Sequence, residues 1–520
     1  MKKFSIKAKC QLGLSRLWSS AKRYYNQYLY PNRLVIVTSL LTALCFFGIF
    51  VMPDWATDSY AISSGCAHVN YGRDAVINGR PFSALFQYLT LGVFHLSMAR
   101  ATQISSALAI FEVGLAILVC YRLYSGIIRA NNRPDQVVLW LLSVLTVINP
   151  MTVELFSFME RCVMMMGVLF AIAGAGRFAR YLRKGERRDI ILSAVYGIVS
   201  MLSYQGVYGT YLVLMALISL IASKGLRQTA RAMVVAIILY VIPCIVGVAA
   251  IKFGVLVTGQ TGRGTSGVDL LKSAAIVLPQ LKEIATFFDT IPPFVAPLIC
   301  LVTLIGAIAH SVAHSSAKGM LCWATGSIFL TFLSMCVAVA PLMMQRPDSI
   351  WISQRIVFPF GLILAVWLAW YFACYSEYIN GGAMACCIFL LLSIELYKFD
   401  GFFTGRFEAN AIDRYRAEWI IQQMNDYEKK SHNIVNSAGF YYDKSVTRLD
   451  KDVMSTRDLN LSAFATNWSD YSIINLYSGR YLIRAPKDQK YADYCAKRDW
   501  NTLDKSQVHF NGRVMNVCLY

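Results

Sequence analysis

The chain has 520 residues, of which 56% are hydrophobic and only 15% are charged, with a mean hydropathy of +0.48. A typical soluble domain carries about 25% charged residues, so this composition excludes a soluble globular protein and an intrinsically disordered one. It predicts an all-α polytopic membrane protein. The formal net charge is +19, and residues 1–397 contribute 31 basic and 15 acidic residues to it. This basic excess lies in short loops and is not interleaved with aromatic residues, so it indicates membrane topology rather than nucleic-acid binding.

The amino-terminal part of the chain begins with a basic segment. Residues 1–33 hold eight Lys and Arg residues, no acid, and several Leu, Trp and Tyr residues. This mixture predicts an interfacial helix on the cytoplasmic leaflet. A first span is predicted over residues 34–52, and an outer loop follows over residues 53–102. Within this loop the apolar stretch 82–98 is either a short span or a helix on the outer face.

The charge of the loops decides the topology. With a cytoplasmic amino terminus, the cytoplasmic side carries 21 basic and 4 acidic residues, and the rest of residues 1–397 carries 10 and 11. A span at 82–98 would invert every later loop, so we interpret this stretch as an outer-face helix and expect the carboxyl terminus outside the cytoplasm. About eleven spans are predicted, at residues 34–52, 103–121, 136–149, 162–176, 190–204, 207–222, 233–256, 292–309, 320–344, 356–375 and 381–397.

The last part of the chain, residues 398–520, lacks long apolar runs. Its first part, 408–429, has the periodicity of a helix, and the rest alternates short strand-like runs with turns. A small extracytoplasmic α+β domain is therefore expected. Its only cysteines are Cys495 and Cys518, and in an oxidising compartment they are predicted to form a disulfide. The chain thus divides into segments 1–33, 34–397 and 398–520.

The first outer loop contains the strongest candidates for chemistry. Asp54 and Asp58 follow the first span, and their spacing would put both carboxylates on one helical face. Asp74, Asn78 and Arg80 precede the outer-face helix. A carboxylate at the membrane boundary can act as a base on a hydroxyl, and an arginine can bind a phosphate through two hydrogen bonds. The alternative is that Asp54 caps a helix and the others are ordinary loop charges.

Other polar residues are expected on the same side. Tyr204 and Gln205 lie in a tight turn between two spans, and the Gly-rich stretch 258–291 is either a mobile flap or a flexible connector. Phosphate-loop, dinucleotide-binding, serine-hydrolase and zinc-peptidase motifs are absent, and no metal site is predicted. The remaining outer-side candidates are Asn149, Glu154, Glu160, Arg161, Ser203, Arg346, Asp348, Trp351 and Arg355.

Four short motifs carry a family resemblance: Asp58, Asn78-Gly79-Arg80-Pro81, Ser203-Tyr204-Gln205, and the helix around Asp413–Met424. In their order and shared side, they resemble the bacterial membrane glucosyltransferases that modify O-antigen, a serotype-converting family of the GT-C class. The resemblance covers the layout of the whole chain. It implies transfer of a sugar, typically glucose, from a polyprenyl-phosphate donor to a lipid-linked or nascent polysaccharide. This would occur on the periplasmic face of the bacterial inner membrane, as a step in lipopolysaccharide modification.

The resemblance also implies roles for individual residues. An acidic residue of the first outer loop acts as the base. The family has two adjacent acids there, whereas Asp54 and Asp58 are four apart; we favour Asp58 and keep Asp54 as the alternative. Arg80 and Arg355, with Arg346 as the next candidate, would stabilise the departing phosphate. The other expected substrate-binding residues are Asn78, Glu154, Tyr204 and Gln205.

The expected partners are the polyprenyl-phosphate-linked sugar, the polysaccharide acceptor and the lipid bilayer, with a donor synthase and a flippase supplying the sugar. No nucleic acid and no resident cofactor are expected, and a divalent cation between Asp58 and the donor phosphate stays open. Two rivals remain. A polysaccharide polymerase or ligase would depend on arginine pairs in a large outer loop. A lipid-linked sugar flippase would need charges lining its spans, where this chain has only Glu112, Lys252 and Glu395.

Overall fold

The computed structural model describes residues 33–63, 72–223, 225–260, 269–280, 295–313, 317–347, 350, 352–442, 460–466, 469–498 and 503–519. The interfacial helix predicted over residues 1–33 and much of the 258–291 stretch lie outside these ranges. So do two outer-side candidates, Asp348 and Trp351.

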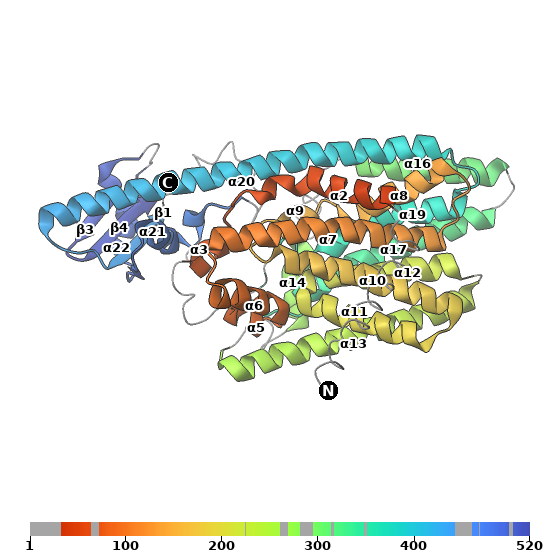
Figure 1. Ribbon diagram of the computed structural model, residues 1–520, viewed down its shortest axis with the longest axis horizontal. Coiled ribbons are helices and arrows are strands. Elements are labelled where there is room, and N and C mark those ends of the chain that lie inside the picture. Colours follow the sequence, from red (N-terminus) through yellow and green to blue (C-terminus); the bar gives the residue numbers. More distant parts are fainter. Residues whose placement is uncertain are drawn as a thin grey trace, which may run out of the picture.

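The chain is mostly helical, and its long helices run side by side as one bundle with a small domain at one end (Figure 1). The bundle contains α2 (Arg33–Phe47), α7 (Met98–Ile127), α8 (Arg133–Val147), α10 (Arg161–Lys184), α11 (Arg187–Ser203), α12 (Gln205–Ala222), α13 (Leu226–Thr258), α16 (Val295–Ala313), α17 (Ala317–Met343), α19 (Ile363–Tyr375) and the first part of α20 (Gly381–Ser431).

Seven helices in the described ranges are long and apolar enough to cross a membrane. They correspond to α2, α7, α10, α12, α13, α17 and α20. The other four predicted spans fall on α8, α11, α16 and α19, which do not meet the combined requirement of length and apolar character. The structure therefore supports a membrane protein, while the count of eleven spans is not confirmed.

Small residues let the central helices approach each other closely. Ser193 and Ser200 of α11 donate hydrogen bonds to the carbonyls of Gly174 and Gly167 on α10, each at 2.8 Å. Such serine and glycine contacts are typical of helix pairs in membranes. In its apolar window α12 is 78% buried and α13 only 22%, which makes α12 a central helix and α13 a peripheral one.

The first outer loop folds into short helices at one end of the bundle, the same end as the small domain (Figure 1). The apolar stretch 82–98 is interrupted: it forms α6 and a π-helical turn, and the chain then bends before α7 begins at Met98. Leu85, Tyr88 and Phe94 are exposed along it, as an interfacial helix requires. The loop helices are α3 (Thr57–Ser63), α5 (Arg73–Ile77) and α6 (Pro81–Gln87).

The chain enters the small domain through the helix α20, which is 51 residues long. At about 1.5 Å per residue it extends some 75 Å, far more than a bilayer requires. The predicted span 381–397 and the predicted helix 408–429 are therefore parts of one continuous helix. The sequence did not indicate this continuity, because the chain changes from apolar to polar midway along the helix. Beyond α20 lie β1 (Ser437–Tyr442), α21 (Asp470–Ser478), β2 (Ile483–Arg484), α22 (Gln489–Ala496), β3 (Val508–Asn511) and β4 (Val514–Leu519).

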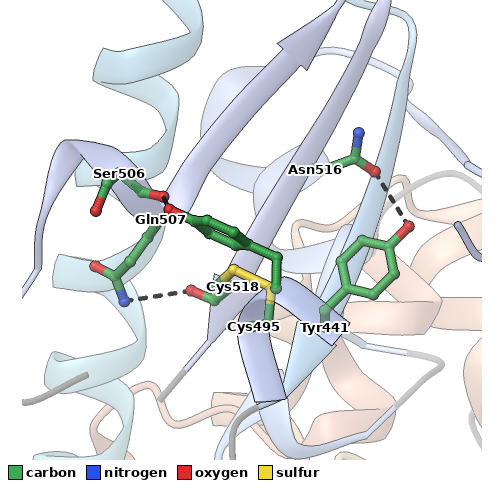
Figure 2. Close-up of a disulfide and its surroundings, with 7 residues drawn as sticks. Tyr441, Cys495, Ser506, Gln507, Asn516 and Cys518 are labelled. Carbon is green, nitrogen blue, oxygen red and sulfur yellow. Dashed lines mark hydrogen bonds between the residues drawn. A yellow bond between two sulfur atoms is a disulfide. The ribbon is translucent and has the colours of Figure 1, made fainter. Parts of the chain in front are cut away.

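The four strands form one mixed sheet in the order β2-β1-β4-β3. β1 is parallel to both of its neighbours, and β3 and β4 form an antiparallel hairpin. The structure joins Cys495 of α22 to Cys518 of β4 by a disulfide, the pair that the sequence predicts (Figure 2). Next to it, Gln507 donates a hydrogen bond to the Cys518 carbonyl, and Tyr441 donates one to Asn516.

Candidate functional site

Polar residues from five separate parts of the chain meet at the end of the bundle nearest the small domain. We call them the polar cluster. They come from α3, from the turn between α5 and α6, from the segment of α9 (Thr152–Leu155) that leads into α10, from the turn between α11 and α12, and from the segment before α18 (Phe358–Gly361). The cluster consists of Asp58, Arg80, Glu154, Glu160, Tyr204, Gln205 and Arg355.

The Asn78-Gly79-Arg80-Pro81 motif is a turn that presents Arg80. Asn78 caps the end of α5, and its side-chain amide donates to the Asp74 carbonyl at 2.8 Å. Gly79 has a φ of +70°, and a Cβ there would lie 2.6 Å from Ile251 on α13, so glycine suits both the backbone and the packing. Pro81 then begins α6 with a φ suited to a first helical position. Each residue of the motif thus has a local structural reason.

Gln205 fixes the direction of Arg80. Its side-chain oxygen accepts a hydrogen bond from Nε of Arg80 at 3.0 Å. Its side-chain nitrogen donates to the carbonyls of Asn78 and Gly79 at 2.9 and 3.1 Å. The Arg80 guanidinium also lies over the Tyr204 ring, 4.5 Å from its centroid. One glutamine therefore ties the 78–80 turn and its arginine to the start of α12.

Tyr204 forms the sharp junction predicted between two spans. It is the single extended residue between α11 and α12, and it is almost fully buried. A Cβ on Gly206 would lie too close to the Arg355 carbonyl and 2.7 Å from the Tyr204 ring, and the Arg80 guanidinium lies over that ring. Both arginines therefore lie next to the same tyrosine.

Arg355 is held by a carboxylate and an aromatic ring. Its Nη1 is 3.2 Å from Oε1 of Glu154, and its backbone N–H donates to Oε2 of Glu154 at 2.8 Å. Its guanidinium lies 3.7 Å from the centroid of the Phe158 ring. Gly206 allows this approach, because a Cβ there would clash with the Arg355 carbonyl. Arg355 and Glu154 are 201 residues apart in sequence, so spacing along the chain does not reveal the pair.

Glu160 links the two arginines to Asp58 electrostatically. It is half-buried and immediately precedes α10. Burial raises the pKa of its carboxyl, its own backbone lowers it, the like charge of Asp58 raises it, and Arg80 and Arg355 lower it. Asp58 is exposed in the first turn of α3. Glu160 was one of several outer-side residues in the sequence, and only the fold distinguishes it from its neighbours.

Asp54 lies in a different environment from Asp58. The expectation that the two carboxylates share one helical face is wrong, because α3 begins only at Thr57. Asp54 is buried, and its two oxygens accept hydrogen bonds from Nη2 of Arg161 at 2.8 and 3.0 Å. Nε of Arg406, on α20, is 3.5 Å from Asp54 Oδ2. Asp54 thus joins a buried ion cluster, whereas Asp58 is exposed and its charge acts on Glu160.

The other predicted residues take various positions. The Asn78 side chain caps α5, and its backbone carbonyl accepts a hydrogen bond from Gln205. Arg346 is half-buried beyond the end of α17. Glu112 and Glu395 lie within the long helices α7 and α20. Within the described ranges, no group of three or more His, Cys, Asp and Glu residues could hold a metal ion.

The fold and the cluster define a membrane protein with a charged site at one end of a helical bundle. Residues 64–266 match the family model described as Glucosyl transferase GtrII. No curated protein matches the chain. The family match confirms the resemblance to the serotype-converting glucosyltransferases of O-antigen, and it supports glycosyltransferase activity. The matched range contains Arg80, Glu154, Glu160 and Gln205, and it excludes Asp58 and Arg355.

Proposed function

We propose that this protein transfers glucose from a polyprenyl-phosphate donor to an O-antigen polysaccharide at the polar cluster. The observation that carries the proposal is the convergence of Arg80 and Arg355 at the start of α12, where Arg80 lies over the Tyr204 ring and the Arg355 carbonyl adjoins Gly206, although the two arginines come from opposite halves of the sequence. Two arginines beside carboxylates provide groups suited to a phosphate leaving group and to a hydroxyl nucleophile.

The reaction requires one displacement. The acceptor hydroxyl oxygen attacks the anomeric carbon of the donor sugar, and the bond from that carbon to the phosphate oxygen breaks. The hydroxyl proton passes to Asp58, and the polyprenyl phosphate leaves with the bonding electrons. Arg80 and Arg355 stabilise the charge that develops on the phosphate. Because phosphate is a good leaving group, the reaction needs no acid to protonate it.

Several residues support these two arginines. Gln205 orients Arg80, and because it is a neutral amide it adds no countercharge. Glu154 fixes Arg355 through two contacts. Tyr204 supplies an aromatic surface under Arg80. We therefore assign Gln205 and Glu154 to positioning the phosphate site, and Asp54 to the structure of the loop rather than to proton transfer.

The protein would lie in the bacterial inner membrane with its amino terminus in the cytoplasm and the small domain in the periplasm. The bias of 21 basic to 4 acidic residues among the predicted cytoplasmic segments supports this orientation. The polar cluster would then face the periplasm. Its donor would have to be synthesised inside the cell and flipped outward before use.

Mass analysis of surface polysaccharide from cells with and without the gene tests the proposal. We expect one additional hexose on the repeat unit when the gene is present. A change in chain length without a new sugar would favour the polymerase or ligase, and accumulation of lipid-linked sugar on one leaflet would favour the flippase. Either result would contradict glucosyl transfer.

A further inference from the structure

The helix that carries Asp58 is held by groups from outside the first outer loop. α3 has only seven residues, so its position must come from tertiary contacts. Just before it, the Trp55 backbone makes two hydrogen bonds with one side chain of α20. The Trp55 N–H donates to Oδ1 of Asn410 at 2.8 Å, and Nδ2 of Asn410 donates to the Trp55 carbonyl at 2.9 Å. These two residues are 355 positions apart.

One turn earlier on α20, Arg406 contacts the same loop. Its Nε is 3.5 Å from Asp54, and its Nη2 donates to the Ser157 carbonyl at 3.1 Å. Arg161, the other partner of Asp54, also donates from Nε to the Phe158 carbonyl at 2.8 Å. The loop that begins α3 and the segment that ends in Glu160 are therefore fastened to each other and to α20.

The far side of α3 enters the small domain. Tyr60 is almost fully buried in an apolar core that includes Ala417, Ile420 and Met424 of α20. Its ring stacks on Trp55 with 5.4 Å between centroids. α21 of the small domain also packs against α3, and Figure 1 shows the two close together where the bundle meets that domain.

We propose that Arg406 and Asn410 of α20 are positioning residues, which together with the apolar core around Tyr60 make the placement of Asp58 depend on the small domain. Through α20, the position of the small domain would thus determine where Asp58 lies in the polar cluster. The proposal rests on the proposed function for the role of Asp58. The contacts of Asn410 with Trp55 and of Arg406 with Asp54, which we call the clamp on α3, can be measured without any assay of sugar transfer.

The test compares two asparagines of the same helix. Asn410→Ala removes both hydrogen bonds to Trp55. The matched control is Asn425→Ala, because Asn425 is also half-buried on α20 and, among the described residues, its side chain accepts a long hydrogen bond of 3.5 Å from Arg480. Asn410→Asp is an intermediate case, since it still accepts from the Trp55 N–H but no longer donates to the Trp55 carbonyl. Each full-length protein is studied in detergent or lipid by hydrogen exchange of residues 57–63 and by transfer kinetics.

We expect faster exchange in residues 57–63 of Asn410→Ala, with unchanged exchange in β4, because the clamp is local. Transfer should show a kcat about 10- to 100-fold lower with little change in KM for either substrate, as for a misplaced catalytic group. Asn410→Asp should fall between Asn410→Ala and the wild type, and Asn425→Ala should match the wild type.

Three results would overturn the proposal. Unchanged exchange in residues 57–63 would show that Asn410 does not hold α3. Faster exchange in both α3 and β4 would indicate general destabilisation instead of a local clamp. Faster exchange in α3 with wild-type kcat would show that the position of α3 does not limit the reaction. If the wild type transfers no sugar, the proposed function fails, and the exchange data still decide whether the clamp exists.

Discussion

Gln205 offers a sharp test of how the phosphate site is built, because its neutral side chain makes three hydrogen bonds to the turn that carries Arg80. Gln205→Leu keeps nearly the same volume and removes the bonds to Arg80, Asn78 and Gly79 at 3.0, 2.9 and 3.1 Å. The predicted result is a protein that still inserts and folds but binds the donor poorly, since Arg80 is no longer aimed at the phosphate.

The size of the effect follows from the bond to Arg80. A hydrogen bond to a charged group contributes about 1.5–3 kcal/mol, against about 0.5–1.5 kcal/mol for a neutral one. If the orientation of Arg80 is lost, kcat/KM for the polyprenyl-phosphate sugar should fall by roughly 10- to 150-fold. The loss of the two bonds to the backbone carbonyls of Asn78 and Gly79 should mainly lower the stability of the turn at residues 78–80.

The assay is transfer of labelled glucose in vesicles that contain the purified protein, with donor concentration varied at saturating acceptor. Gln136→Leu is the control, because Gln136 is an exposed glutamine on α8. A Gln205→Leu protein with wild-type kcat/KM for the donor would refute the view that Gln205 orients a phosphate-binding arginine.

Three further predictions concern individual groups. Arg80→Ala should lower kcat/KM for the donor by about 10- to 100-fold, and Arg80→Lys should restore only part of it because lysine lacks the planar fork; equal activity of both variants would contradict this. Burial raises the pKa of the Glu160 carboxyl, so its folded-state stabilisation is present at low pH and is lost as the pH rises through the folded-state pKa. The melting temperature of Glu160→Gln should therefore rise relative to that of the wild type as the pH increases above the ordinary pKa of glutamate, about 4.3, and a difference that shrinks with rising pH would contradict the sign. Cys518→Ser should destabilise the small domain by about 3 kcal/mol in denaturant unfolding, and peptide mapping of unreduced wild type should find the Cys495–Cys518 crosslink rather than free thiols.

Local pattern was enough to predict much of the architecture. Each of the eleven predicted spans overlaps a helix in the described part of the chain, because an apolar run in a membrane protein has few alternatives to helix. The Asn78-Gly79-Arg80-Pro81 motif was informative for a similar reason, since capping, a positive φ and a first-turn proline are properties of single residues. Tyr204 and Gln205 were predicted at a tight turn, and the structure has one there.

Contacts between distant parts of the chain could not be predicted in this way. Nothing near Asp54 in the sequence indicates Arg406 as its neighbour, so Asp54 stayed an alternative to Asp58 as the base. The pairing of Glu154 with Arg355 and the electrostatic influence of both arginines on Glu160 depend on how distant parts of the chain pack together. The continuity of α20 was hidden because the part that leaves the bundle carries the charges of a soluble helix.

The central claim is that the polar cluster performs the transfer and that Asp58 receives the proton. The most direct measurement is the rate of hexose transfer from the polyprenyl-phosphate donor to the lipid-linked acceptor by the wild type and by Asp58→Asn, in vesicles with matched amounts of folded protein. The account predicts transfer by the wild type and a rate about 10²–10⁴-fold lower for Asp58→Asn, because the amide cannot accept the proton. Transfer by Asp58→Asn at the wild-type rate would contradict it.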